Sequence, residues 1–173
     1  MAPPRLTAAD FPREVLTLFD QYVHGAIDRR GFIGRGAAVL GSAAARFAEA
    51  HPNGNGKLGA VGFCYGGGIV NWLATQMESL RAGVPFYGAP PDLDAVPNIR
   101  AEMLVQHGGN DTRLVEGWPA HEAALKAAGV RYQGFVYPGA EHGFNNDTTP
   151  RFNAEAAALA WSRTLELFRR TLA

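Results

Sequence analysis

The sequence predicts an α/β fold, with a mostly parallel sheet of about four strands flanked by helices. Short apolar runs alternate with longer segments whose apolar residues recur at helical spacing, which is the pattern of parallel strands joined by helices. Glycine accounts for 21 of the 173 residues, well above the average of about 7%. That many glycines suit a chain with many tight strand-to-helix turns, and the length allows a single domain with its own hydrophobic core.

Composition excludes several classes of function. Lys plus Arg and Asp plus Glu each number 16, so the formal net charge is zero, and no overall field would attract nucleic acid or an acidic partner. The chain has one cysteine, which excludes an internal disulfide and a zinc site built from several cysteines. The single thiol, that of Cys64, therefore needs another explanation.

The N-terminal part of the chain predicts an amphipathic helix that begins near residues 6–12. Its apolar residues fall on one face, and we expect that face to be packed. The face comprises Phe11, Val15, Leu18, Phe19, Tyr22 and Val23.

Arg29 and Arg30 precede a Phe-Ile pair and a stretch of small residues, and this segment resembles a twin-arginine export signal with cleavage sites of the Ala-x-Ala type near residues 43–50. The alternative is an ordinary alanine-rich helix from about Ala37 to Ala50 with solvated arginines. We expect a cytoplasmic location, or a periplasmic one if the arginine pair acts as a signal. The apolar run is too short to span a membrane, so no membrane partner is expected.

The next element is the centre of the sequence. An apolar run at residues 57–63 leads directly into Gly62-Phe63-Cys64-Tyr65-Gly66, and a helical apolar pattern follows. Strand, tight turn and helix are the context of a nucleophile elbow, here with cysteine as the nucleophile. Gly62 and Gly66 would let strand and helix pass without Cβ clashes. The helix N-terminus would favour the thiolate of Cys64, and the Tyr65 N–H would donate to an oxyanion. The alternative is a buried structural cysteine beside a glycine-rich turn.

Three further strands and two helices complete the prediction. Strands are expected at residues 83–88, 102–107 and 130–137, and a helix carrying Trp118 should end at Gly129. A last helix should run from about Asn153 to Leu172. Its inward residues are expected to be Ala157, Ala160, Trp161, Thr164, Leu165 and Phe168.

Three polar residues come just after predicted strands, namely Cys64, Asp111 and His142. Because parallel strands present their carboxyl ends at one edge of a sheet, we expect these side chains to meet there. His142 would take the thiol proton of Cys64, and Asp111 would orient the imidazole. Taken singly, His142 would be a loop histidine with a local hydrogen bond and Asp111 an Asx-turn.

Taken together, residues 62–67, Gly108-Gly109-Asn110-Asp111 and His142-Gly143-Phe144 resemble the dienelactone hydrolase family of the α/β-hydrolase superfamily. The strand end at residues 86–88 and the last helix, with Trp161, are also similar to that family. The resemblance begins near Ala43, so residues 43–173 would be the C-terminal part of such a domain and residues 1–42 a helical leader segment. It implies a partial α/β-hydrolase fold.

The resemblance also implies an activity. A carboxylic ester hydrolase similar to carboxymethylenebutenolidase would act on a small lactone or ester through a thioester on Cys64, without metal or cofactor. Phe144 and Asn145 would contact the substrate. Some relatives hold the substrate carboxylate with an arginine just after this histidine, where the present chain has Asn145 and Asn146.

Family members have several strands ahead of the elbow strand, and this chain has no room for them, so the resemblance implies that the N-terminal half of the hydrolase domain is missing. The second oxyanion donor is then unassigned. A weakly active or inactive family member that serves as a binding or assembly module is one alternative function, and a thiol-reactive redox or acyl-carrying protein is another. The strand at residues 57–63 would become an apolar edge, which predicts a homodimer.

Overall fold

The computed structural model describes residues 13–26 and 29–173. The chain divides into two compact units, Met1–Phe47 and Ala48–Ala173. The predicted start of the first helix, including Phe11, lies outside the described residues. None of the described helices is both long and apolar enough to cross a membrane.

Two helices, α1 (Arg13–Val23) and α2 (Arg29–Glu49), fill most of the N-terminal region. In the predicted apolar face of α1, Leu18 is half-buried, but Val23 is 60% exposed. The prediction for Val23 was therefore wrong, and the reason is its position on the last turn of the helix. Helix α2 begins at Arg29 and not near Ala37. Residues 29–36 contain three arginines, which favour a helix, and no proline, although their three glycines disfavour it.

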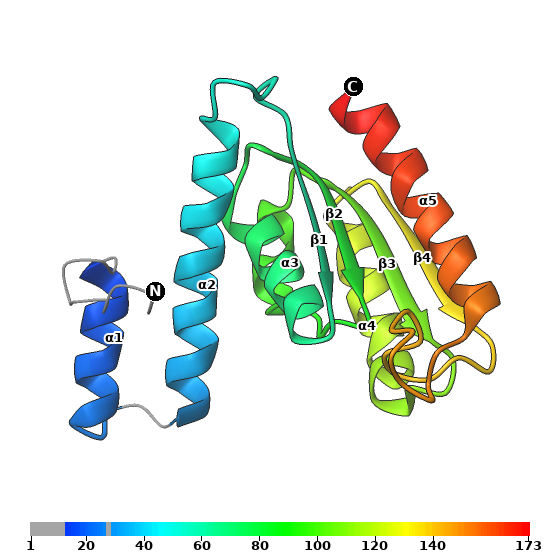
Figure 1. The fold of residues 1–173 in the computed structure, drawn as a ribbon, viewed down its shortest axis with the longest axis horizontal. Helices are drawn as coiled ribbons and strands as arrows, with labels where there is room; N and C mark the ends of the chain where they lie inside the picture. Colours follow the sequence, from blue (N-terminus) through cyan, green and yellow to red (C-terminus); the bar gives the residue numbers. More distant parts are fainter. Residues whose placement is uncertain (1–12, 27–28) are drawn as a thin grey trace, which may run out of the picture. The chain divides into compact units, whose positions relative to one another are not determined.

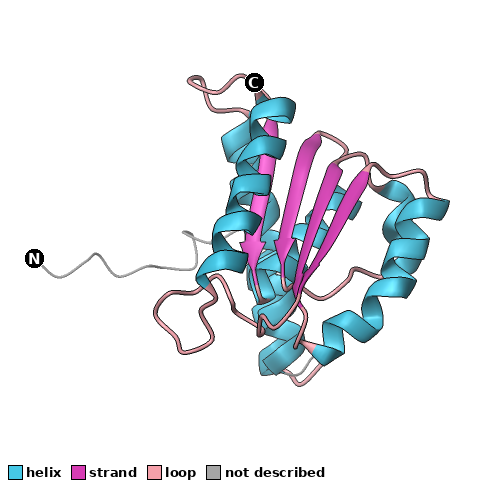
Figure 2. Ribbon diagram, turned by 90° about the vertical axis from the view of Figure 1, so that its right-hand side faces the viewer, coloured by secondary structure: helices cyan, strands magenta, loops and turns pink. Residues whose placement is uncertain are grey.

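The second unit contains a four-stranded parallel sheet in the order β1-β2-β3-β4 (Figures 1 and 2). The predicted fold class and strand number are confirmed. Each pair of consecutive strands is joined by a crossover, as parallel pairing requires. The strands are β1 (Leu58–Phe63), β2 (Leu80–Phe86), β3 (Glu102–Gly108) and β4 (Tyr132–Tyr137), and the helical elements are α3 (Tyr65–Gln76), η2 (Leu93–Asn98), α4 (Thr112–Ala127) and α5 (Ala154–Leu172).

Neighbouring residues of β3 show which helices cover which face. The Gln106 amide reaches α5, where it donates to Thr164 Oγ1 at 3.0 Å, while the His107 ring lies 5.7 Å from the Trp118 ring of α4. Because successive side chains of a strand point to opposite faces, α5 covers one face and α4 the other. Helix α3 packs on β1 and β2. The strands are therefore buried mainly by these three helices.

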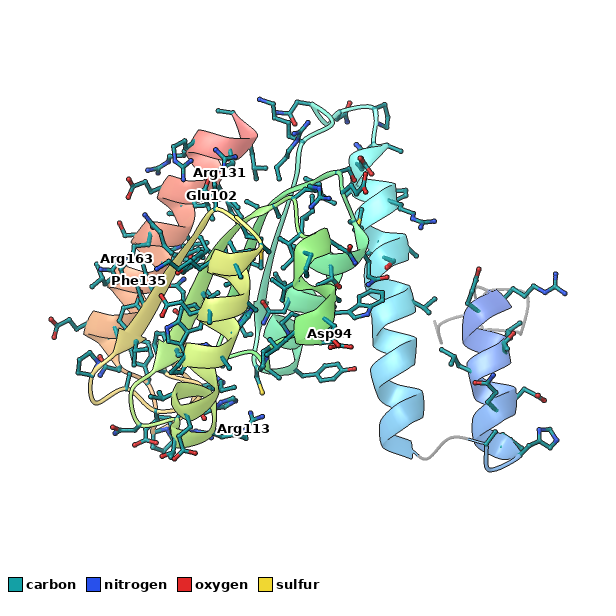
Figure 3. The ribbon with its side chains drawn as sticks, turned by 180° about the vertical axis from the view of Figure 1, so that it is seen from behind. Asp94, Glu102, Arg113, Arg131, Phe135 and Arg163 are labelled. Carbon is teal, nitrogen blue, oxygen red and sulfur yellow. The ribbon has the colours of Figure 1, made fainter. Side chains whose placement is uncertain are left out.

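Helix α5 packs on the sheet through small residues and a cation–π contact. Its buried residues are Ala156, Ala157, Ala160, Thr164 and Leu167. Trp161 is 41% exposed, so its predicted inward position was wrong. The small residues bring the helix too close to the sheet to leave room for an indole. In Figure 3, the labelled Arg163 and Phe135 lie side by side, with the guanidinium carbon 3.6 Å from the ring centroid.

The C-terminal end of α5 is tied to the chain just ahead of β1. Asn55 Nδ2 donates to the Leu172 carbonyl at 2.7 Å, and Lys57 Nζ donates to the carbonyl oxygen of Ala173. At the same end of the sheet, Arg170 forms a bidentate ion pair with Glu102, the first residue of β3, with N–O distances of 2.6 and 2.9 Å. The edge where the strands begin is therefore fastened to α5 by charged and polar contacts.

Strand β1 is an edge strand within the described residues, because it pairs only with β2. It contains neither a charged residue nor proline, and Val61 and Phe63 are 36% and 39% exposed. Edge strands are usually protected by charge, proline or a bulge away from the neighbour. Strand β1 has neither a charged residue nor a proline to protect its edge.

A small cavity lies beside β3 and α4, at the face opposite α5. It has a volume of about 180 Å³ and is lined by His107, Trp118, His121 and four neighbours. Burial lowers the pKa of both His107 and His121 to about 4. His107 Nδ1 is buried without a hydrogen-bond partner. Both imidazoles are therefore neutral in the folded protein at physiological pH.

These two histidines predict a pH-dependent stability. Each histidine binds a proton more tightly in the unfolded chain, where its pKa is near 6.5, than in the folded protein. Acid therefore stabilises the unfolded state. The free energy of unfolding should fall by about 2 kcal/mol for each histidine between about pH 7 and pH 5. Urea unfolding at the two pH values measures this, and His121→Phe should remove about half of the dependence. An unchanged free energy of unfolding in the unsubstituted protein would contradict the prediction.

Candidate active site

The turn after β1 holds Cys64 in a conformation that few non-glycine residues adopt. Its φ is 55° and its ψ is −116°, and α3 begins at the next residue, Tyr65. The Cys64 N–H donates to the Phe86 carbonyl at 3.0 Å, which fixes the turn to the end of β2. A strained backbone held by its surroundings is common at functional sites. The Cys64 thiol is exposed at the carboxyl edge of the sheet.

Close backbone contacts explain two glycines near this turn. A Cβ at Gly62 would lie 2.2 Å from the Gly66 carbonyl oxygen, and a Cβ at Gly67 would lie 2.7 Å from the Phe86 carbonyl oxygen. A Cβ at Gly66 would meet nothing within 4 Å. The prediction for Gly62 agrees with these contacts, whereas the prediction that Gly66 must lack a Cβ was wrong. Strand β1 passes over the backbone of residue 66, and it is Gly67 that contacts β2.

Asp111 and His142 reach the same place from two other loops. His142 Nδ1 lies 2.5 Å from Asp111 Oδ2, and His142 Nε2 lies 3.1 Å from Cys64 Sγ. Asp111 stands at the N-cap of α4, but its carboxylate does not cap the helix, since it accepts from the imidazole. Asp111 is buried, and the His142 side chain is 28% exposed. The structure thus brings together all three residues that the sequence singled out.

Glycines and an asparagine set the distance between the Asp111 and His142 loops. A Cβ at Gly108 would lie 2.6 Å from the carbonyl oxygens of Ala140 and Glu141, so the end of β3 runs against the loop that follows β4. The Asn110 N–H donates to the Ala140 carbonyl at 2.9 Å, and its side chain donates to Glu141 Oε1 at 3.0 Å. The Gly-Gly-Asn-Asp sequence therefore positions Asp111 through backbone contact.

Cys64 and His142 open into a pocket of about 430 Å³. Arg151 is the only arginine or lysine among its lining residues, and Asp147 is the only carboxylate. The lining residues are Phe63, Cys64, Tyr87, His142, Gly143, Asn145, Asn146, Asp147 and Arg151. The volume suits a small organic molecule, and Arg151 offers it one positive charge.

The two predicted substrate contacts lie in different places. Asn145 lines the pocket. Phe144 is 0% exposed and packs in the hydrophobic core, with its ring centroid 5.1 Å from that of Tyr137 and 5.4 Å from that of Tyr87. A molecule in the pocket would not touch Phe144, so that prediction was wrong. This aromatic residue, two positions after His142, anchors the loop and leaves the pocket lining to its neighbours.

Sequence reasoning missed Tyr87 and Arg151. Tyr87 directly follows β2, so it stands at a strand end in the same way as the three predicted residues, and that position was the available signal. Arg151 is nine residues after His142, too far to be read as its neighbour. The chain folds back because the Asn153 N–H donates to the Phe144 carbonyl at 3.0 Å, which closes the loop and returns Arg151 to the pocket.

Comparison with known proteins fits this geometry. The model of the dienelactone hydrolase family matches residues 17–172. The chain belongs to the dienelactone hydrolase family. The match starts further towards the N-terminus than the resemblance seen in the sequence, which began near Ala43.

Relatives within the dienelactone hydrolase family cover the chain only in part. A protein from Synechocystis sp., provisionally named carboxymethylenebutenolidase, is 34% identical over 127 residues, which are 67% of this chain and 51% of that protein. One of the same provisional name from Saccharolobus solfataricus is 36% identical over 115 residues, 66% of this chain and 44% of that protein. The chain spans about half the length of the curated relatives it matches.

Solved structures of this family share the fold. A crystal structure from Klebsiella pneumoniae, provisionally named dienelactone hydrolase, has a TM-score of 0.72 at 28% identity, covering 79% of this chain and 62% of that one. The dienelactone hydrolase-like promiscuous phosphotriesterase P91, from metagenomic libraries, has a TM-score of 0.71 at 27% identity. The match covers 94% of this chain and 70% of that one. Over the described residues, no group of three or more histidine, cysteine or acidic side chains is arranged to hold a metal ion.

The glycine contacts at the elbow predict opposite effects for two similar substitutions. Gly62→Ala would press a Cβ against the backbone of residue 66 and should destabilise the protein by about 3 kcal/mol or more. Gly66→Ala meets open space and gains helix propensity worth up to about 1 kcal/mol, so its stability should be unchanged or higher. Urea unfolding of both variants measures the difference. Equal stabilities would show that the close approach at Gly62 is not a constraint.

Proposed function

We propose that this member of the dienelactone hydrolase family hydrolyses a small ester or lactone, with Cys64 as the nucleophile. The observation that carries the proposal is the continuous chain from Cys64 Sγ through His142 to Asp111, with contacts of 3.1 and 2.5 Å. A thiol, an imidazole and a carboxylate in that order are the groups needed for nucleophilic acyl transfer.

In the first half of the proposed reaction, His142 Nε2 takes the thiol proton, and the Cys64 sulfur attacks the ester carbonyl carbon. The carbonyl becomes a tetrahedral oxyanion, which the Tyr65 N–H at the start of α3 would stabilise. The C–O bond to the leaving oxygen then breaks, and His142 gives that oxygen its proton. In a lactone, the leaving oxygen stays attached to the acyl group, so ring opening leaves the whole molecule on Cys64 as a thioester.

In the second half, His142 removes a proton from water, and the hydroxide attacks the thioester carbon. The C–S bond breaks, and the carboxylic acid leaves while Cys64 recovers its proton. Asp111 holds the imidazole by accepting from Nδ1–H and stabilises the positive charge that His142 carries in both halves. Every step uses groups of this chain and water, so the proposed reaction involves no cofactor.

The substrate we propose carries a carboxylate of its own. Arg151 lines the pocket with Cys64 and His142 and is the only arginine or lysine there. A guanidinium binds a planar carboxylate through paired hydrogen bonds. Arg151 would therefore hold the acidic end of the substrate while the ester carbonyl faces Cys64.

The nucleophile assignment predicts graded losses. Cys64→Ala and His142→Ala should reduce hydrolysis of p-nitrophenyl acetate to the background rate, because the attacking group or its base is gone. Asp111→Asn should reduce it less, by up to about 10⁴-fold. In the unsubstituted protein, a quenched reaction should add one acyl mass to the peptide that contains Cys64. Undiminished turnover by Cys64→Ala, or a label found only on lysine or serine, would disprove the thioester route.

Substituting Arg151 tests the proposed substrate class. Arg151→Gln should raise KM about tenfold or more for an ester that carries a free carboxylate, because a charged hydrogen bond is worth roughly 1.5–3 kcal/mol. KM for a neutral ester such as p-nitrophenyl acetate should change little. Arg113→Gln is the matched control, since Arg113 lies on α4 outside this pocket (Figure 3). Equal effects of Arg151→Gln on both esters would exclude a carboxylate contact.

We also propose that the chain forms a homodimer, because β1 presents an uncharged edge and the exposed side chains of Val61 and Phe63. Two β1 edges could pair about a two-fold axis. Sedimentation equilibrium at micromolar protein should give twice the mass of one chain. Val61→Lys should shift the protein towards monomer, since lysine on an edge opposes pairing. A folded monomer in the unsubstituted protein would refute the dimer.

A further inference from the structure

We propose that Tyr87 is a positioning residue for the candidate site, with its ring supporting His142 and its hydroxyl fixing the loop that carries Asn145. The inference rests on the proposed function, because it assigns Tyr87 a role in bringing His142 to Cys64. Tyr87 contacts three separate parts of the site, namely the cysteine turn, the imidazole and the pocket-lining loop. It is 3% exposed, although it belongs to the pocket lining.

The backbone of Tyr87 is strained and held on both sides. Its φ is 38°, in the left-handed region that non-glycine residues seldom adopt. The Tyr87 N–H donates to the Gln106 carbonyl at 2.7 Å, and the carbonyl just before it, of Phe86, accepts from the Cys64 N–H at 3.0 Å. The peptide that connects Phe86 to Tyr87 therefore links β3 to the cysteine turn. A tyrosine maintained in this conformation has a fixed side-chain direction relative to Cys64.

The Tyr87 ring supports the imidazole. The two ring centroids are 5.1 Å apart at an interplanar angle of 58°. On its other sides, the Tyr87 ring contacts Phe144 and Phe86 at centroid distances of 5.4 and 6.1 Å, and both phenylalanines are fully buried. The hydrogen bond to Asp111 holds only one edge of the imidazole. A fixed ring beside the imidazole, tilted by 58° to it, limits rotation about that bond and keeps Nε2 directed at Cys64 Sγ.

The Tyr87 hydroxyl connects to the loop after His142. Burial first, and then the negative charge that Cys64 can carry, raise the pKa of Tyr87 to about 12, although the Asn145 peptide N–H and the charge of Arg151 act to lower it. The phenol therefore stays neutral over the range in which enzymes work, and its oxygen faces the backbone N–H of Asn145, which lines the same pocket. The charged or titratable groups that share its pocket are Cys64, His142, Asp147 and Arg151.

Two substitutions separate the ring from the hydroxyl. Tyr87→Leu removes the ring, so the pH profile of Cys64 alkylation by iodoacetamide should move to higher pH, with the rate near neutral pH and kcat each falling about tenfold or more. Tyr87→Phe keeps the ring and removes the hydroxyl, so the alkylation profile should stay in place while KM rises several-fold and kcat changes little. Tyr132→Phe is the control, because Tyr132 lies at the start of β4 outside the pocket.

Each outcome decides one part of the inference. A folded Tyr87→Leu protein with the alkylation profile of the unsubstituted protein would overturn the role of the ring, and an unchanged KM in Tyr87→Phe would overturn the role of the hydroxyl. If Tyr87→Leu does not fold, Tyr87→Met provides the same test with a side chain closer in volume. Alkylation requires no hydrolysis, so a shifted profile in a protein without esterase activity would support this inference and refute the proposed function.

Discussion

The contact between the end of β2 and the start of α3 is the constraint on which the site depends. Here Gly67 and Gly88 approach so closely that a Cβ at Gly88 would lie 2.3 Å from the Gly67 carbonyl carbon. This approach allows the Cys64 N–H to reach the Phe86 carbonyl, and that hydrogen bond holds the cysteine turn in its strained conformation. The free energy of the strain, of the order of 1–3 kcal/mol, is offset by backbone contacts that no side chain could replace.

The other two residues of the site are positioned in a similar way, by backbone rather than by side-chain packing. Asp111 follows a glycine pair that lets β3 touch the loop after β4, and His142 lies in that loop. Short, inflexible connections at the carboxyl edge of a parallel sheet place polar groups within hydrogen-bond distance although they are far apart in the chain. The buried Tyr87 ring, which packs on Phe86 and Phe144, then covers one side of the imidazole.

The fold class, the strand number and the meeting of Cys64, Asp111 and His142 could be predicted because each depends on local pattern. An apolar run followed by a polar residue marks a strand end, and parallel strand ends share an edge. Phe144, Gly66 and Trp161 were misjudged because their environment is set by contacts distant in sequence: the core under the loop, the passage of β1 over α3, and the close packing of small residues in α5. Arg151 depends on how a whole loop closes, which no periodicity records.

The polar ties between α5 and the chain ahead of β1 have a practical consequence. Asn55 and Lys57 hold the last residues of α5 at the edge where the strands begin, whereas the pocket opens at the edge where they end. A group joined after Ala173, such as a fluorescent protein, an affinity tag or a solid support, would therefore lie at the end of the strands opposite Cys64. Immobilised in that orientation, the protein would present its pocket to the solution, which suits a sensor surface or a flow reactor.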